Sequence, residues 1–166
     1  MYDSRIDTYD HIDKVRAYLG RTIINLLDRA LIHDASKLES PEVEMFDEFT
    51  PKLAELEYGS PEYKATTGAM GAALEHHYEH NSHHPEHYEN SIEGMSLLDL
   101  LEMICDWKAA SERHTKRPAM PAAPGRAEAP KYDSNIERSI DLNQERWGYS
   151  DELKSILLNT VKELGL

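Results

Sequence analysis

Residues 33–37, His-Asp-Ala-Ser-Lys, bring together three side chains that suit chemistry at a metal ion. His33 offers an imidazole nitrogen and Asp34 a carboxylate, a mixed ligand set suited to a borderline or hard divalent cation. In a helix, neighbouring side chains point about 100° apart, so both reach one ion only at a helix edge or end. On a helix, Lys37 would hold its ammonium group beside this pair. There the ammonium could donate a hydrogen bond to a phosphate bound by the metal. Taken alone, a His-Asp pair is equally typical of a surface turn.

A second group of candidate ligands lies in residues 75–88, which contain six of the nine histidines. On a continuous helix these histidines would form two stripes: His76, His80, His83 and His87 in one, and His77 and His84 in the other. Pro85 and the preceding Asn-Ser pair favour a helix that ends near residue 80 and a turn after it. A solvated polar surface or an adventitious metal-binding tract is the alternative interpretation.

Two isolated residues complete the candidate ligands. His11 lies in the first turn of the first predicted helix. Because it is next to the apolar Ile12, its side chain could point toward the protein interior. Asp106 lies between Cys105 and Trp107, at the edge of an apolar helix face. Exposure is the ordinary state of both residue types, and a buried aspartate would need a cation.

The composition limits the possible partners. A net charge of −13 over 166 residues argues against a nucleic-acid polymer, which requires clustered Lys and Arg, but permits a small anionic substrate in a locally cationic pocket. The single cysteine excludes an internal disulfide and a thiolate zinc cluster. No signal-peptide core and no apolar run near the ~20 residues of a membrane span is present. We therefore expect a cytoplasmic protein with no membrane partner; the oligomeric state is left open.

Helical periodicity dominates the chain, so we expect one all-α domain over residues 1–166 with about six to seven helices. Valine occurs only three times and no alternating strand pattern is present. A metal-binding core is expected over about residues 8–114, and C-terminal helices over 133–166. The predicted helices span residues 8–28, a short segment 29–38, 41–58 with a break near Pro51, 61–80, 96–114, 134–147 and 151–164.

Residues 117–131 contain four of the eight prolines and should form a loop. Its basic residues Arg117, Arg126 and Lys131 stand out in an acidic chain. The loop is either a lid over the pocket or a simple connector.

The order of these features resembles the HD superfamily of metal-dependent phosphohydrolases. The resemblance covers about residues 8–114 and includes the His-Asp-x-x-Lys form of the motif at residues 33–37. The Gly-Tyr-Pro signature of the cyclic-dinucleotide branch is absent. The size and the His-rich turn are similar to those of small phage and bacterial members.

The resemblance implies a fold of HD type and a site for one or two divalent ions, with Mn, Mg, Fe, Co and Zn as candidates. Binuclear branches add two histidines between the His-Asp pair and the last aspartate. We favour His77 and His84 for these places, with His76 and His83 as the rival pair. The implied metal ligands are therefore His11, His33, Asp34, His77, His84 and Asp106.

The implied activity is hydrolysis of a small phosphate ester, with a nucleotide favoured as substrate. Asp34 would bridge the two metals, and Lys37 would neutralise charge on the phosphoryl group. Glu75, Glu79 or Asp99 could act as general acid or base, or support a metal ligand. Two alternatives remain: a di-iron oxygenase, suggested by the histidine-rich ligands, and a non-catalytic, metal-stabilised helical binding module.

Overall fold

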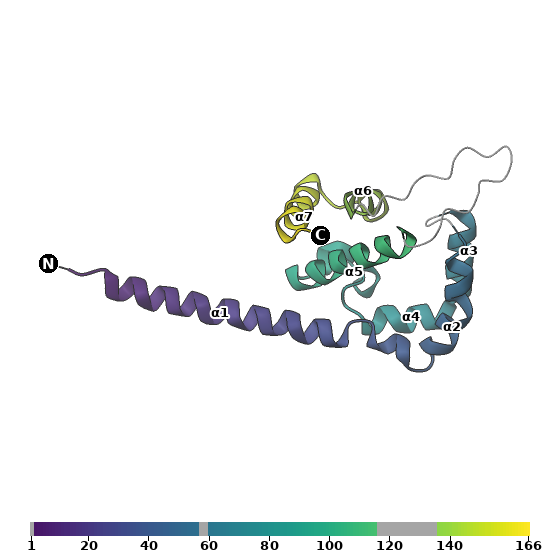
Figure 1. The fold of residues 1–166 in the computed structure, drawn as a ribbon, viewed down its shortest axis with the longest axis horizontal. Coiled ribbons are helices and arrows are strands. Elements are labelled where there is room, and N and C mark those ends of the chain that lie inside the picture. The colour runs from purple at the N-terminus through teal and green to yellow at the C-terminus, as the bar shows by residue number, and fades with distance from the viewer. Residues whose placement is uncertain (1, 57–59, 116–135) are drawn as a thin grey trace. The chain divides into compact units, whose positions relative to one another are not determined.

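The computed structural model describes residues 2–56, 60–115 and 136–166, without the side chains of 113–115. Within these ranges the chain forms seven α-helices and three short 3₁₀ helices, and no strand (Figure 1). This confirms the prediction of an all-α protein with six to seven helices.

The chain divides into two compact units, residues 1–77 and 78–166. The first unit contains α1 (Arg5–Ile32), α2 (Glu42–Leu53), α3 (Pro61–Ala69) and most of α4 (Gly71–His80). The second unit contains the end of α4, then α5 (Leu97–Thr115), α6 (Ile136–Trp147) and α7 (Asp151–Leu164).

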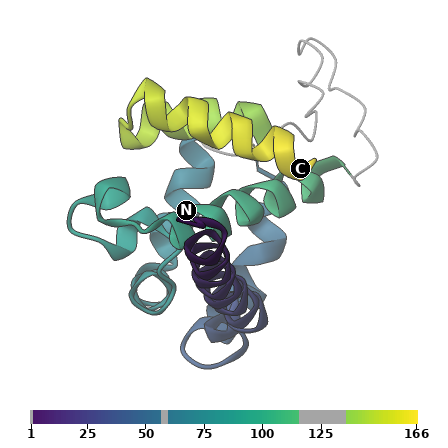
Figure 2. The same cartoon turned by 90° about the vertical axis from the view of Figure 1, so that its left-hand side faces the viewer.

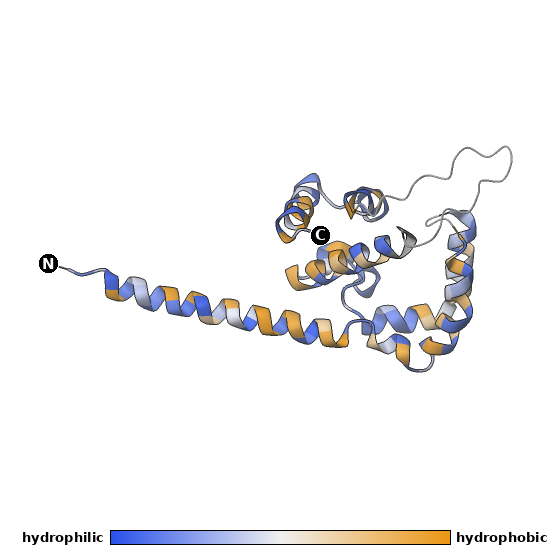
Figure 3. Cartoon of the chain, in the orientation of Figure 1, coloured by the Kyte–Doolittle hydropathy of each residue, from blue (hydrophilic) through white to orange (hydrophobic). Residues whose placement is uncertain are grey.

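Helix α1 is longer than predicted, because it includes residues 29–32, which were expected in a separate segment. None of its 28 residues is buried. Apolar residues lie along its whole length between charged ones (Figure 3). The helix ends at Ile32, because His33 leaves the helical conformation with ψ 125°, and Asp34 after it adopts a left-handed backbone with φ 55°.

The boundaries of the next three helices correct the sequence prediction at two points. Helix α2 continues through Pro51 to Leu53, where a break was expected, since proline loses only one backbone hydrogen bond in a last turn. The single helix predicted for residues 61–80 is divided into α3 and α4 at Met70, and Gly71 has a positive φ of 45°. Glycine adopts this conformation without a steric penalty.

Helices α5, α6 and α7 enclose the apolar core of the second unit, and α6 and α7 lie side by side (Figures 1 and 2). The largest fully buried side chains of this core are Met103, Ile104 and Ile140. Tyr149 is also buried and donates its hydroxyl to the backbone oxygen of Ile140 at 2.6 Å. The apolar residues of these helices therefore pack together in part. The exposed ones include Leu97, Cys105, Leu142, Ile156 and Leu164.

Serine side chains cap the first turns of α3 and α7. Ser60 accepts the backbone N–H of Tyr63 at 3.1 Å, and Ser150 accepts that of Leu153 at 3.2 Å. The predicted loop 117–131, with Arg117, Arg126 and Lys131, lies outside the described residues. In the part that is described, every helix is too short or too polar to cross a membrane.

Candidate metal site

The end of α1 determines how the His-Asp pair is presented. His33 is the C-terminal cap of α1, and the left-handed backbone of Asp34 leads into a 3₁₀ helix at Ala35–Leu38. Non-glycine residues seldom adopt this conformation, although aspartate tolerates it better than most, and such positions often occur at functional sites. The pair thus lies at a helix end, where both side chains can reach one ion.

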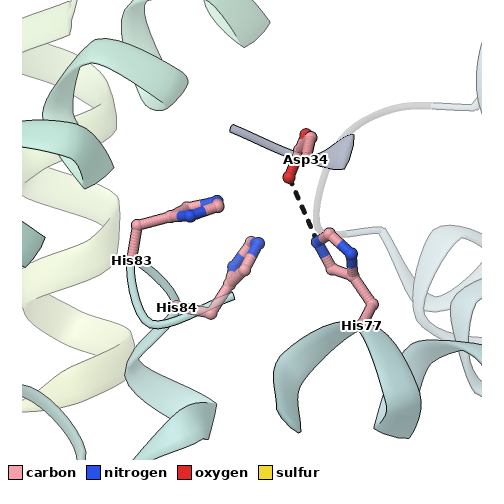
Figure 4. Close-up of side chains that lie close together, drawn as sticks. All are labelled: Asp34, His77, His83 and His84. Carbon is pink, nitrogen blue, oxygen red and sulfur yellow. Dashed lines mark ion pairs between the residues drawn. The ribbon is translucent and has the colours of Figure 1, made fainter. Parts of the chain in front are cut away.

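Asp34 is the centre of an electrostatic cluster in the first unit. The Nζ atom of Lys37 lies 2.5 Å from its Oδ2, and Nε2 of His33 lies 3.6 Å from the same oxygen. Nε2 of His77 faces the other oxygen, Oδ1, at 3.4 Å (Figure 4). Burial alone would raise the pKa of Asp34, but the charges of Lys37, His33 and His77 outweigh it and hold the pKa below its ordinary value. Asp34 is therefore ionised near neutral pH.

Glu42, the first residue of α2, supports His77 from the opposite side. Its carboxylate is fully buried and lies 2.9 Å from Nδ1 of His77 through Oε2, and 2.7 Å from Nδ1 of His76 through Oε1. Ser36 donates its hydroxyl to Oε2 at 3.1 Å. Burial would raise the pKa of Glu42, but the hydrogen bonds from His76, Ser36 and His77 lower it. Glu42 is thus an ionised acceptor for both rings.

The two carboxylates assign the protons of His77. Because an ionised Glu42 can only accept, Nδ1 of His77 carries the hydrogen, and in the neutral ring Nε2 is then an acceptor. Burial and the nearby Lys37 lower the pKa of His77, which favours this neutral form. Two acceptors, His77 Nε2 and Asp34 Oδ1, therefore face each other at 3.4 Å. A bound cation would turn this unfavourable contact into a favourable one.

Within the second unit, two histidines lie in the turn after α4. His83 is buried, with Nδ1 3.1 Å from Oε1 of Glu102 on α5. The ring of His84 lies 4.2 Å, centroid to centroid, from that of His83, and 5.2 Å from that of Tyr78; Figure 4 shows both histidine rings. Asp106 is half-buried on α5, one turn beyond Glu102. The rival His83 therefore has the better-supported ring.

The described part of the chain thus contains buried and half-buried histidine, aspartate and glutamate groups that could hold a metal ion. In the first unit these residues are His33, Asp34 and His77; in the second they are His83, His84, Glu102 and Asp106. Histidine nitrogens combined with carboxylate oxygens suit zinc, manganese, iron or cobalt better than calcium.

His11 is not brought to this cluster. It is exposed on α1, 22 residues before His33 on one continuous helix. At 1.5 Å per residue, this spacing separates them by about 33 Å along the helix axis. The sequence prediction ended the first helix near residue 28 and placed residues 29–38 in a separate short segment, which would have allowed the two histidines to meet.

Asp99 has a structural environment, in contrast to the catalytic role considered for it. Its buried carboxylate accepts hydrogen bonds from Ser82 at 2.7 Å, Tyr88 at 2.9 Å, and both the hydroxyl and the backbone N–H of Ser96 at 2.6 and 2.8 Å. With Ser96 it forms a capping box at the start of α5. Burial would raise the pKa of Asp99, but the hydrogen bonds from Ser96, Ser82 and Tyr88 outweigh this effect and hold the pKa well below its ordinary value. Asp99 therefore ties the turn before α5 to that helix.

Glu75 and Glu79, the other candidates for acid–base chemistry, are exposed on α4. Three supporting residues were not predicted: Glu42, Ser36 and Glu102. Glu42 and Ser36 resembled an ordinary first-turn acid and an ordinary turn residue, and Glu42 meets His76 and His77 only across 34 and 35 residues of sequence. No local spacing could have indicated those contacts.

The protein is therefore all-α in its described part and has candidate metal ligands next to a His-Asp pair. It belongs to DUF5662, described as a family of unknown function, whose model matches residues 1–163. No curated protein and no solved structure matches the chain.

Proposed function

We propose that this protein is a divalent-metal-dependent phosphohydrolase that acts on a small phosphate ester, with a nucleotide favoured as substrate. The observation that carries the proposal is the pair of acceptors at 3.4 Å, His77 Nε2 and Asp34 Oδ1, whose protonation is determined by Glu42 and Lys37. Histidine and aspartate with a lysine next to them are the residue types that metal-dependent phosphate chemistry requires.

The proposed ligands of the first unit are His33, Asp34 and His77. The resemblance to the HD superfamily implies the remaining ligands: Asp106, and His84 or its rival His83. We do not include His11 among the ligands, because the continuous helix α1 separates it from His33 of the same chain.

A divalent cation held by these residues would lower the pKa of a bound water and polarise the phosphoryl oxygens. Glu42 would keep His77 in the tautomer whose Nε2 presents a lone pair that can ligate a metal. Lys37 would stabilise the charge that develops on the phosphoryl group, from its position beside Asp34. Its ion pair with Asp34 at 2.5 Å places the ammonium directly at the carboxylate that would ligate the metal.

The experiment is a metal-by-substrate matrix on the full chain. The protein is stripped with a chelator, reloaded separately with Mn, Mg, Fe, Co or Zn, and assayed for phosphate release from nucleotides and an aryl phosphate. We expect turnover with at least one metal, lost in His77→Gln and kept in His80→Gln, which changes an exposed histidine of the same helix. Metal binding without any phosphate release would contradict the hydrolase and favour the binding module.

The same matrix tests the di-iron alternative. An oxygenase would require iron, would absorb visible light when oxidised, and would consume dioxygen with its substrate. A colourless protein that turns over phosphate esters with manganese or magnesium is the result expected from our proposal. A cytoplasmic location is part of the proposal and rests on the sequence alone.

A further inference from the structure

Helix α1 exposes an unusual amount of apolar surface. It spans 28 residues, about 42 Å at 1.5 Å per residue, and none of them is buried. Tyr9, Leu19 and Ile23 are 67, 57 and 58% exposed. Helices in water gain most of their stability from packing an apolar face, so a helix of this length and composition requires a partner.

The apolar residues of α1 follow a heptad pattern. Positions separated alternately by three and four residues form one stripe, and six of these seven positions are apolar: Tyr9, Ile12, Arg16, Leu19, Ile23, Leu26 and Ala30. This spacing is typical of the seam of a two-stranded coiled coil. The stripe therefore matches another helix of the same pattern.

We propose that α1 pairs with α1 of a second copy of this chain in an antiparallel coiled coil centred on Arg21. In this register the layers of the seam join residues whose numbers add to 42. Leu19 faces Ile23 of the second copy, and Ile12 faces Ala30. The interface is isologous, so it closes as a dimer.

Arg16 explains why the antiparallel arrangement is preferred. In a parallel pair the two Arg16 side chains would face each other in the seam, and like charges there are unfavourable. In the antiparallel register each Arg16 faces Leu26 of the other copy, so its aliphatic stem packs while its head remains in water. The two guanidinium groups are then separated by ten residues, about 15 Å along the axis.

The area is sufficient for a dimer. Burying one Leu or Ile side chain removes roughly 60–120 Å² of apolar surface from water, at the usual relation between area and transfer energy. In this register six positions of each copy face one another, so the two copies together remove roughly 700–1,400 Å², the upper part of which reaches the range of stable protein interfaces. A second copy of the chain is sufficient to bury this area. The inference does not depend on the proposed hydrolysis.

The test is the molecular mass of the full chain in solution, measured by light scattering, for wild type and two matched variants. Ile23→Asp places a carboxylate in the seam, whereas Ile24→Asp changes an equally exposed neighbour, 59% against 58%, that lies about 100° away from the seam. We expect wild type and Ile24→Asp at twice the 19.0 kDa of one chain. Ile23→Asp should raise the dimer dissociation constant by about 100-fold or more, since each dimer then holds two carboxylates in its seam.

The direction of the pairing is tested by disulfide formation in a background of Cys105→Ser, which removes the free cysteine. A mixture of Ile12→Cys and Ala30→Cys proteins should give a covalent heterodimer, and neither protein alone should cross-link. In the antiparallel pair, two copies of either residue are separated by about 27 Å along the axis.

Three results would overturn the proposal. They are a monomeric wild type at the concentrations used for activity, dissociation by Ile24→Asp without dissociation by Ile23→Asp, and cross-linking of Ile12→Cys with itself. A circular-dichroism melt of Ile23→Asp shows whether the second unit remains folded, so that loss of the dimer is distinguished from unfolding.

Discussion

His77 donates its Nδ1–H to a carboxylate oxygen of the fully buried Glu42, 2.9 Å away, while its Nε2 faces Asp34 at 3.4 Å. The ring of His77 thus lies between two carboxylates. Glu42 fixes its tautomer, and Asp34 could bind the same metal ion as the ring. Carboxylate–histidine pairs of this kind orient the ligands of metal sites.

Replacing Glu42 by glutamine should weaken metal binding by about 10–100-fold, the usual cost of losing a group that orients a ligand. The amide keeps the shape but offers only one acceptor oxygen to His76 and His77. Metal affinity measured by competition with a chelator is the check, and Glu44→Gln, an exposed acid of the same helix, is the control. Unchanged affinity in Glu42→Gln would show that Glu42 is only a buried structural partner.

Asp34→Asn and His77→Gln should each lower the metal content of the purified protein, because each removes a ligand with no substitute beside it. His80→Gln should retain the wild-type content, since His80 is exposed. Metal analysis of the three proteins, prepared in parallel, decides the outcome. Equal metal content in all three would remove Asp34 and His77 from the site.

Asp106→Ala tests the part of the ligand set that rests on the resemblance alone. We expect reduced metal content with an unchanged melting temperature of the metal-free protein, because Asp106 is only half-buried on α5. His83→Gln and His84→Gln, compared directly, decide between the favoured histidine and its rival. Full metal content in Asp106→Ala would show that this aspartate is an ordinary surface residue.

Lys37→Met should leave the metal content of the loaded protein unchanged and lower turnover by about 10²–10³-fold, because one charge partner of the phosphoryl group is lost. The melting temperature of the metal-free protein should fall, since Asp34 then loses the cation 2.5 Å from its Oδ2. Lys37→Ala separates the loss of charge from the loss of the stem. Normal turnover in both variants would contradict the role in phosphate binding.

Asp99→Asn should lower the free energy of unfolding by about 2–4 kcal/mol at pH 7, because the carboxylate accepts four hydrogen bonds while buried. The folded protein holds the pKa of Asp99 below its ordinary 3.8, so this stabilisation is present above pH 3.8 and is lost as the pH falls below it. Urea unfolding across pH 3–7 should show the two proteins converging on acidification. A difference that stays constant with pH would mean that the charge of Asp99 is not what stabilises the turn.

The sequence alone determined those features whose physical cause is local. Ser60, Ser96 and Ser150 begin helices because each hydroxyl accepts a backbone N–H only three residues ahead. The all-α fold follows from the period of the apolar residues in the same way. His33, Asp34 and His77 could be named as candidate ligands because their residue types and their order along the chain carry chemical information before any folding.

Only the tertiary structure decided the contacts between residues distant in sequence. Glu42 became a partner of His76 and His77 because the fold brings the start of α2 to the last turns of α4. Asp99 became a tether because Ser82 and Tyr88 return to the start of α5. The separation of His11 from His33 depends on whether α1 continues through residues 29–32, where helix propensity permits either outcome. These differences have one physical reason: caps and periodicity act over a few residues, whereas burial and ion pairing depend on which surfaces the folded chain brings together.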